Sequence, residues 1–137
     1  MSDGTLRILV VDDVADLVEP FVDVLNAEEG LEVVATASNG SEAVDRAREF
    51  EPDVVLMDVR MPGMDGIKAT RAIRRHGLGP RILMMTAYDD ESLVREAMDA
   101  GADGYLVKGT LVSDVIVAIR ATARAPRRTD EPDAAAG

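Results

Sequence analysis

The sequence predicts an α/β fold in which five strand–helix units, (βα)5, build one doubly wound, five-stranded parallel sheet with helices on both faces. Five short runs of mostly branched apolar residues recur along the chain. They are apolar on both faces, as expected for strands of a parallel sheet that is buried on both sides. Segments with the apolar period of a helix separate them, which favours right-handed crossovers. The strands are expected at residues 8–11, 33–36, 54–57, 82–85 and 105–107.

The first helix is expected directly after the first strand. Pro20 lies inside its apolar stripe, and a proline in the interior of a helix costs about 3 kcal/mol. We therefore expect the helix to begin at Asp16, with Glu19 completing a pair that resembles a capping box. The stripe consists of Val14, Leu17, Val18, Phe21, Val22 and Leu25.

Capping signals mark the next two helices. Asn39 followed by Glu42 predicts the start of the second. The third is expected to start after Asp65 and to end over residues 74–77, where two arginines and a histidine precede Gly77.

The last two helices are expected from about Asp90 to Ala100, with Gly101 as the stop, and after Thr110. The residues predicted to be buried are Leu93, Val94, Ala97 and Met98 in the fourth helix, and Val112, Val115, Ile116 and Ile119 in the fifth.

The length of 137 residues suits a single domain. We place it at residues 1–124. Residues 125–137 contain prolines, alanines and charges without periodicity, and they predict a disordered tail or a linker.

Composition excludes several classes of function. Fifteen basic residues against 26 acidic ones give a net charge of −11, which argues against direct binding of nucleic acid. The longest apolar run, residues 115–119, is too short to cross a membrane, so a cytoplasmic location is expected. With no cysteine and one histidine, a metal is expected to be a hard cation such as Mg²⁺ on carboxylates.

Polar residues follow the predicted strands at the edge where ligands bind in such sheets. Three ionised carboxylates gathered there would repel one another by on the order of 10 kcal/mol, so either they retain protons or a divalent cation and Lys108 compensate them. A carboxylate beside Mg²⁺ and an ammonium group is also a suitable acceptor for a phosphoryl group. The residues are Asp12 and Asp13 after the first strand, Asp58 after the third, Thr86 and Ala87 after the fourth, and Lys108 after the fifth.

Four motifs in this order and spacing resemble the receiver domain of bacterial two-component response regulators. They are the pair Asp12-Asp13, the run VVLMDVRMPGMDG at residues 54–66, MMTA at 84–87, and GADGYLVK at 101–108. The last motif also resembles receivers that precede a DNA-binding domain of the LuxR type. The resemblance implies a flavodoxin-like sheet with strand order 2-1-3-4-5.

Carried over to this chain, the resemblance implies that Asp58 accepts a phosphoryl group from a phosphohistidine of a sensor histidine kinase. Asp13, Asp58 and the backbone carbonyl of Arg60 would bind Mg²⁺, and Asp12 would assist through water. Lys108 would pair with a phosphoryl oxygen. The only catalysis implied is self-phosphorylation from a phosphodonor and autodephosphorylation.

The resemblance also implies a switch. The hydroxyl of Thr86 would contact the new phosphoryl group, Tyr105 would swing inward behind it, and the small Ala87 would allow close approach. Pro62 and Gly66 would shape the loop after the acceptor. We expect the fourth helix, fifth strand and fifth helix to form the face that changes, and to form a homodimer there or exchange partners. Charged positions expected on it are Arg95, Glu96, Asp99, Asp103, Asp114 and Arg120.

Two features leave alternatives open. Gly109 follows Lys108 where the family often has a proline after a cis bond, so the orientation of this loop is unsettled.

The chain is also consistent with a receiver-like interaction module that is never phosphorylated. A haloacid-dehalogenase-like phosphatase is excluded because Val14 and Arg60 stand where its Asp-x-Asp motif needs a second aspartate. If transcription is controlled, DNA binding would reside in an output domain outside these residues.

Overall fold

The structure is a computed structural model that describes residues 4–61, 63–86 and 91–125, without the side chains of residues 15–17. The expectations for Pro62, Ala87 and residues 126–137 lie outside this part of the chain. Five strand–helix units follow one another. Their bounds are β1 Leu6–Val11, α1 Ala15–Ala27, β2 Leu31–Ala37, α2 Gly40–Phe50, β3 Val54–Asp58, α3 Gly66–Arg75, β4 Arg81–Thr86, α4 Glu91–Ala100, β5 Gly104–Val107 and α5 Val112–Arg124.

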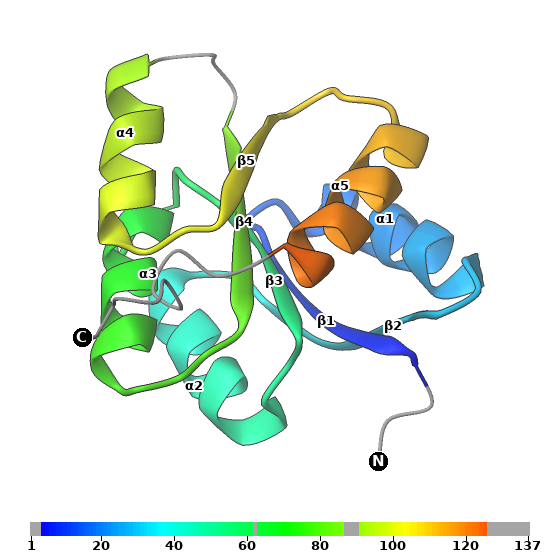
Figure 1. The fold of residues 1–137 in the computed structure, drawn as a ribbon, viewed down its shortest axis with the longest axis horizontal. Coiled ribbons are helices and arrows are strands. Elements are labelled where there is room, and N and C mark those ends of the chain that lie inside the picture. The colour runs from blue at the N-terminus through cyan, green and yellow to red at the C-terminus, as the bar shows by residue number, and fades with distance from the viewer. Residues whose placement is uncertain (1–3, 62, 87–90, 126–137) are drawn as a thin grey trace.

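The five strands form one parallel sheet in the order β2-β1-β3-β4-β5. In Figure 1, α1 and α5 cover one face of this sheet and α2, α3 and α4 cover the other. The predicted α/β class, strand number and strand order are therefore confirmed. The parallel pairing of β1 with β3 places their carboxyl ends side by side at the point where the strand order reverses, which is where ligands bind in such sheets.

Apolar side chains fill the space on both faces of the sheet. One core lies under α2, α3 and α4 and includes Met57 and Ile73. The other lies under α1 and α5 and includes Leu56 and Ile119. All five residues of β3 are buried, so the aspartate that ends this strand is held by packing on both sides.

The start of α1 corrects one prediction. The helix begins at Ala15, and its N-cap residue Val14 makes no side-chain capping bond, so the cap predicted at Asp16 is wrong. The reason lies one turn earlier, where Asp12 Oδ1 accepts the backbone N–H of Val14 at 2.9 Å and turns the chain into the helix. Pro20 is inside α1, as its sequence position required.

The predicted caps of α2 and α3 are confirmed. Asn39 Oδ1 accepts the N–H of Glu42 at 2.9 Å, and Asp65 Oδ1 accepts the N–H of Lys68 at 2.9 Å. Gly77 follows α3 with φ of 75°. In the last two helices Ala97, Val115 and Ile119 are buried, while the other residues predicted to be buried there are partly exposed.

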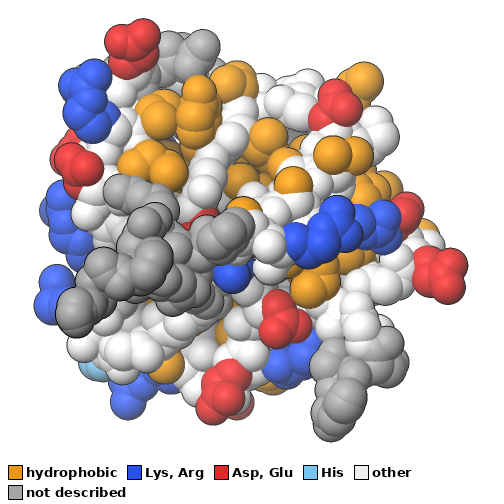
Figure 2. All heavy atoms as spheres, in the orientation of Figure 1, with side chains coloured by type: hydrophobic (Ala, Val, Ile, Leu, Met, Phe, Trp, Pro, Cys, Tyr) orange, Lys and Arg blue, Asp and Glu red, His pale blue; other side chains and the backbone are white. Residues whose placement is uncertain are grey.

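The face formed by α4, β5 and α5 carries apolar surface. Figure 2 shows hydrophobic side chains gathered between α4 and α5. Tyr105 of β5 is 41% exposed and Val117 of α5 is 66% exposed. Asp103 and Arg120, predicted to be available on this face, are instead paired within the chain with Arg74 and Glu28. Among the described helices, none has the length and apolar character needed to cross a membrane.

Candidate functional site

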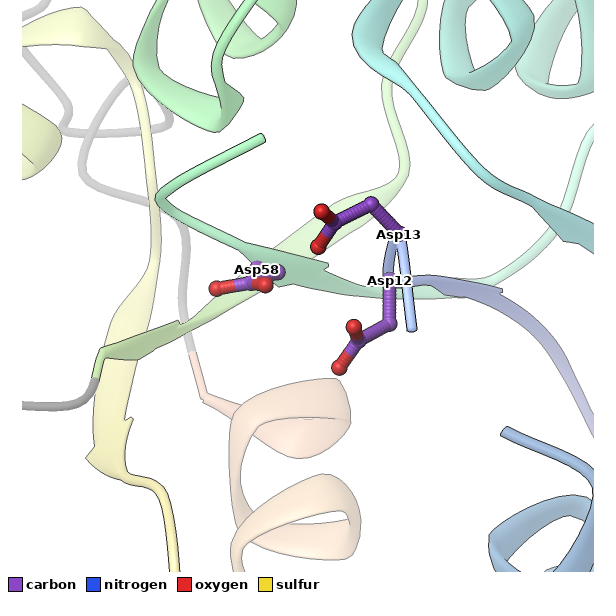
Figure 3. A group of neighbouring side chains, drawn as sticks. All are labelled: Asp12, Asp13 and Asp58. Atoms are coloured by element: carbon purple, nitrogen blue, oxygen red, sulfur yellow. The ribbon is translucent and has the colours of Figure 1, made fainter. Parts of the chain in front are cut away.

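Three carboxylates meet at the carboxyl ends of β1 and β3. Asp12 and Asp13 follow β1 directly, and Asp58 is the last residue of β3. Figure 3 shows the three side chains directed into the same region beyond the strands. One ligand oxygen from each lies within 4.8 Å of the others. The sequence prediction that these residues converge is thus confirmed by the geometry.

Lys108 connects two of these carboxylates. Its Nζ donates to Asp58 Oδ2 at 3.1 Å and lies 3.2 Å from Asp12 Oδ2. The Asp58 side chain is only 6% exposed. One ammonium offsets one of three negative charges, so the site retains a strong attraction for a further cation.

The protonation behaviour of Asp58 and Lys108 reflects this crowding. Burial raises the pKa of the Asp58 carboxyl above its usual range, the hydrogen bond and charge of Lys108 oppose that rise, and the charge of Asp12 adds to it. Burial lowers the pKa of Lys108, but its hydrogen bonds to Asp58 and Asp12 outweigh burial and the pKa is raised overall. The site therefore stabilises the ammonium more than it stabilises the buried carboxylate.

A tight turn after β5 positions Lys108. The N–H and Oγ1 of Thr110 both donate to the carbonyl of Val107, at 3.3 and 2.6 Å. Gly109, the third residue of this turn, has φ of 93°, which glycine adopts without strain. The N–H of Lys108 donates to the carbonyl of Thr86 at 2.7 Å. No described peptide bond is cis, so Lys108 reaches Asp58 without a cis peptide after it.

Two residues that follow Asp58 in the sequence, Arg60 in the loop and Gly66 at the start of α3, lie against the acceptor. The N–H of Arg60 donates to Asp58 Oδ1 at 3.3 Å. Gly66 is packed so closely that a Cβ atom added to it would lie 2.2 Å from the carbonyl oxygen of Asp58. Gly66 is therefore required by contact with the acceptor's own backbone, which is a stronger reason than the loop shape predicted from the sequence.

Thr86 and Tyr105 lie behind the carboxylates. Thr86 ends β4 and is buried, whereas Tyr105 of β5 is exposed. Both border one small cavity of about 10 Å³, together with Leu93 and Ala97 of α4. The structure therefore holds Tyr105 in an outward orientation, next to Thr86 but not inserted behind it.

Sequence reasoning did not foresee Thr110 as a residue that shapes the site. Its role depends on two bonds to Val107 that close the turn around Lys108. The available signal was local: glycine at the third position of a turn, followed by a residue with a hydroxyl group.

The fold and the carboxylate–lysine site define a doubly wound α/β domain with an acidic site at the carboxyl ends of its strands, and comparison with known proteins gives its family. Residues 8–120 match the response regulator receiver domain, and the chain belongs to this family. It therefore takes part in two-component signalling, in which histidine kinases phosphorylate receiver domains.

Individual relatives of the chain agree with this family assignment, and response regulators are among them. The chain is 39% identical over 114 residues to the transcriptional regulatory protein LnrK of Bacillus subtilis, a match that covers 83% of this chain and 52% of LnrK. It is 42% identical over 116 residues to the chemotaxis protein CheY of Bacillus subtilis, covering 85% of this chain and 96% of CheY. A LuxR-family response regulator from Aurantimonas has a similar structure, with a TM-score of 0.84, 36% identity and coverage of 90% and 88% of the two chains.

The chain spans about half the length of LnrK and of several other regulators it matches. It spans nearly all of CheY. The receiver domain is thus the part that all of these proteins share with this chain.

Proposed function

We propose that Asp58 is the phosphoacceptor of this receiver. The observation that supports it best is the contact of a buried Asp58 with Lys108, beside Asp12 and Asp13. In the transfer, an Asp58 carboxylate oxygen forms a bond to phosphorus while the bond between phosphorus and a histidine nitrogen of the kinase breaks. The histidine nitrogen keeps the electron pair of the broken bond.

Asp12, Asp13 and Asp58, with the carbonyl of Arg60, would hold Mg²⁺. Their chemistry fits, because Mg²⁺ prefers oxygen ligands in an octahedron at about 2.1 Å, which puts ligand oxygens about 3.0 to 4.2 Å apart. The three carboxylate oxygens within 4.8 Å need only a small closure to reach that spacing. When bound, Mg²⁺ lowers the cost of bringing an anionic phosphoryl group to an acidic site.

Lys108 and Thr86 would hold the phosphoryl group once it is attached. Lys108 already contacts Asp58 Oδ2 and can donate to a phosphoryl oxygen with little movement. Thr86 is buried beside the cavity that Tyr105 borders. If the Thr86 hydroxyl turns towards a phosphoryl oxygen, Tyr105 can rotate inward and change the α4–β5–α5 surface.

This surface would then bind a second copy of the chain. Its exposed apolar side chains, Tyr105 and Val117, suit a symmetric contact, and Figure 2 shows hydrophobic side chains gathered between α4 and α5. Two charge-assisted contacts from Lys108 and Thr86 contribute about 3–6 kcal/mol, close to the roughly 5.5 kcal/mol that inverts a 1:99 equilibrium.

We further propose control of transcription through a DNA-binding output domain outside these residues. The support is the match to the receiver half of LnrK, a transcriptional regulatory protein. The net charge of −11 opposes direct contact of the receiver itself with DNA phosphates. The cytoplasmic location stays a prediction from the sequence.

Phosphorylation of the purified chain by acetyl phosphate, followed by intact mass, tests the acceptor. One phosphate should be added with Mg²⁺ and none with a chelator. Asp58→Asn should abolish the addition, while Asp45→Asn, an exposed aspartate on α2, should leave it intact. Unchanged labelling of Asp58→Asn would refute the assignment. No labelling of the native chain would favour an interaction module that is never phosphorylated.

A further inference from the structure

A separate pocket opens between α1 and α5, beside the carboxylate site. Its volume is about 240 Å³. Val18 and Phe21 of α1 form one wall, Val112 and Val115 of α5 form the other, and Met85 of β4 lies at its base. Figure 1 shows the two helices side by side on this face of the sheet. The pocket is thus lined mainly by hydrocarbon.

The two helices are tied at the end remote from the pocket. Arg120 of α5 donates to the Glu28 carboxylate at 3.3 Å and to the Glu29 carbonyl at 2.6 Å. Both acceptors follow the last residue of α1. The two helices are therefore held together near the C-terminal ends of α1 and α5, and they leave a space near the carboxyl ends of the strands, where the carboxylates lie.

The polar end of the pocket belongs to the phosphorylation site. Asp12, Lys108 and Thr110 line it there, with Lys108 Nζ 3.2 Å from Asp12 Oδ2. An ammonium group has three donors, and the Lys108 contacts with Asp12 and Asp58 use two of them. The third can donate to an acceptor on a ligand, and the Asp12 carboxylate can accept from a donor.

Size and charge together define the ligand. A dry cavity of about 150 Å³ lined by apolar side chains binds benzene, whereas drug-sized ligands need about 300 Å³ or more. A group that both accepts from Lys108 and donates to Asp12 is a hydroxyl. A ligand carboxylate would lie against the Asp12 carboxylate, and a ligand ammonium would have to share Asp12 with Lys108.

We propose that this pocket binds a small, uncharged alcohol or phenol with an apolar body about the size of one ring. By bridging Asp12 and Lys108, such a ligand occupies the third donor of Lys108 and an oxygen of Asp12. Phosphorylation requires Lys108 to meet a phosphoryl oxygen and Asp12 to assist the metal, so the bound ligand slows phosphorylation. This coupling rests on the proposed function, whereas the binding itself does not.

Benzyl alcohol is the probe, titrated into the full chain and followed by the NMR methyl signals of Val18 and Val115. Saturable shifts confined to the α1–α5 pocket support the proposal. Benzoate, which has the same ring but carries a negative charge, should bind at least tenfold more weakly. Equal binding of benzyl alcohol and benzoate overturns the ligand class.

Two variants fill the pocket from opposite walls. Val112→Phe and Val18→Phe should each weaken benzyl alcohol binding at least tenfold, with circular dichroism confirming that at least one of them is folded. Val117→Phe on the same helix α5 is the matched control, because Val117 is 66% exposed; it should bind as the native chain does. Absent saturation, or shifts that persist unchanged in a folded pocket-filling variant, overturns the proposal.

A kinetic measurement tests the coupling separately. Saturating benzyl alcohol should slow phosphorylation by acetyl phosphate, and the phosphorylated protein should bind the probe more weakly by about fivefold or more, because the probe and the phosphoryl group compete for Lys108. If benzyl alcohol binds without changing the phosphorylation rate, the coupling is refuted and the binding site is still supported. If the native chain is not phosphorylated by acetyl phosphate even without benzyl alcohol, the proposed function is refuted, while the NMR evidence for binding is unaffected.

Discussion

Lys108 Nζ and Asp58 Oδ2 lie 3.1 Å apart across the ends of two strands that are not neighbours, because β4 lies between β3 and β5. The contact joins residues 50 positions apart and closes the carboxylate site on one side. It forms only if the turn after β5 brings the lysine back over β4. The reactivity of Asp58 is therefore tied to the conformation of a distant loop.

The raised pKa of Asp58 predicts that Asp58→Asn stabilises the fold. Between the usual pKa of a carboxyl and the raised value, the folded state holds a proton that the unfolded state has lost, so stability falls as pH rises through this window. Asparagine carries no titrating carboxyl, so the variant does not lose stability by ionising a buried group. The melting temperature of Asp58→Asn, measured without metal, should exceed that of the native chain at neutral pH, and the difference should disappear as pH falls below the usual carboxyl value.

Asp45→Asn provides the control, since Asp45 is exposed on α2, and its melting temperature should follow that of the native chain at both pH values. A neutral-pH melting temperature lower in Asp58→Asn than in the native chain would show that the bond with Lys108 outweighs burial.

Mg²⁺ should stabilise the folded chain through its carboxylates. A ligand present at 100 times its dissociation constant adds about 2.7 kcal/mol to the free energy of unfolding. Asp13 is the cleanest residue to remove, because it is exposed and Lys108 contacts the other two aspartates. Asp13→Asn should lose the Mg²⁺-dependent rise in melting temperature, while Asp23→Asn on α1 should keep it. An equal Mg²⁺-dependent rise in the melting temperatures of Asp13→Asn and Asp23→Asn would show that the metal binds at another site.

The fold could be predicted because its signals are local. Apolar runs marked the strands, and Asn39 and Asp65 marked helix starts that the structure confirms. The gathering of Asp12, Asp13 and Asp58 followed from parallel topology alone, since the carboxyl ends of such strands share one edge.

What the sequence did not reveal depends on contacts between residues far apart in the chain. Asp103 was expected to be available on the surface, but its carboxylate accepts from Arg74 at 3.0 Å and from the N–H of Ile82 at 2.8 Å. No local sequence pattern predicts that the Asp103 carboxylate will pair with an arginine of a helix 29 positions away. The start of α1 was missed for a related reason, because the Asp12 carboxylate takes part both in the site and in the turn into the helix.

Arg74 should be the most costly surface arginine to remove. Its guanidinium donates to the carbonyls of Leu78, Pro80 and Gly101 and to the Asp103 carboxylate, at 2.8 to 3.2 Å. Arg74→Ala removes all of these bonds and should lower the free energy of unfolding by about 2–4 kcal/mol. Chemical denaturation measures this loss.

Arg74→Lys should recover only a small part of the stability, because an ammonium cannot reproduce the planar fork of donors. The neighbouring Arg75 is exposed, and Arg75→Ala should change stability by less than about 0.5 kcal/mol. Similar losses in Arg74→Ala and Arg75→Ala would contradict the role given to this network.

Gly109→Ala should slow phosphorylation more than its effect on stability explains. Gly109 has φ of 93°, and no atom lies within 4 Å of a Cβ placed there. The substitution therefore causes no clash, and its cost is the backbone strain of about 1–2 kcal/mol for an L residue in this region. The turn can relieve that strain by changing conformation, which moves Lys108 away from Asp58. We expect phosphorylation by acetyl phosphate to slow about tenfold.

Gly77→Ala is the matched control for this prediction. Gly77 has φ of 75°, and no atom lies within 4 Å of a Cβ placed there either, but it ends α3 at the opposite edge of the sheet. Both variants should lose similar stability, and only Gly109→Ala should lose phosphorylation rate. Gly109→Asn should recover part of the rate, because asparagine tolerates positive φ better than alanine does. Equal rates in Gly109→Ala and Gly77→Ala would show that the turn does not position Lys108.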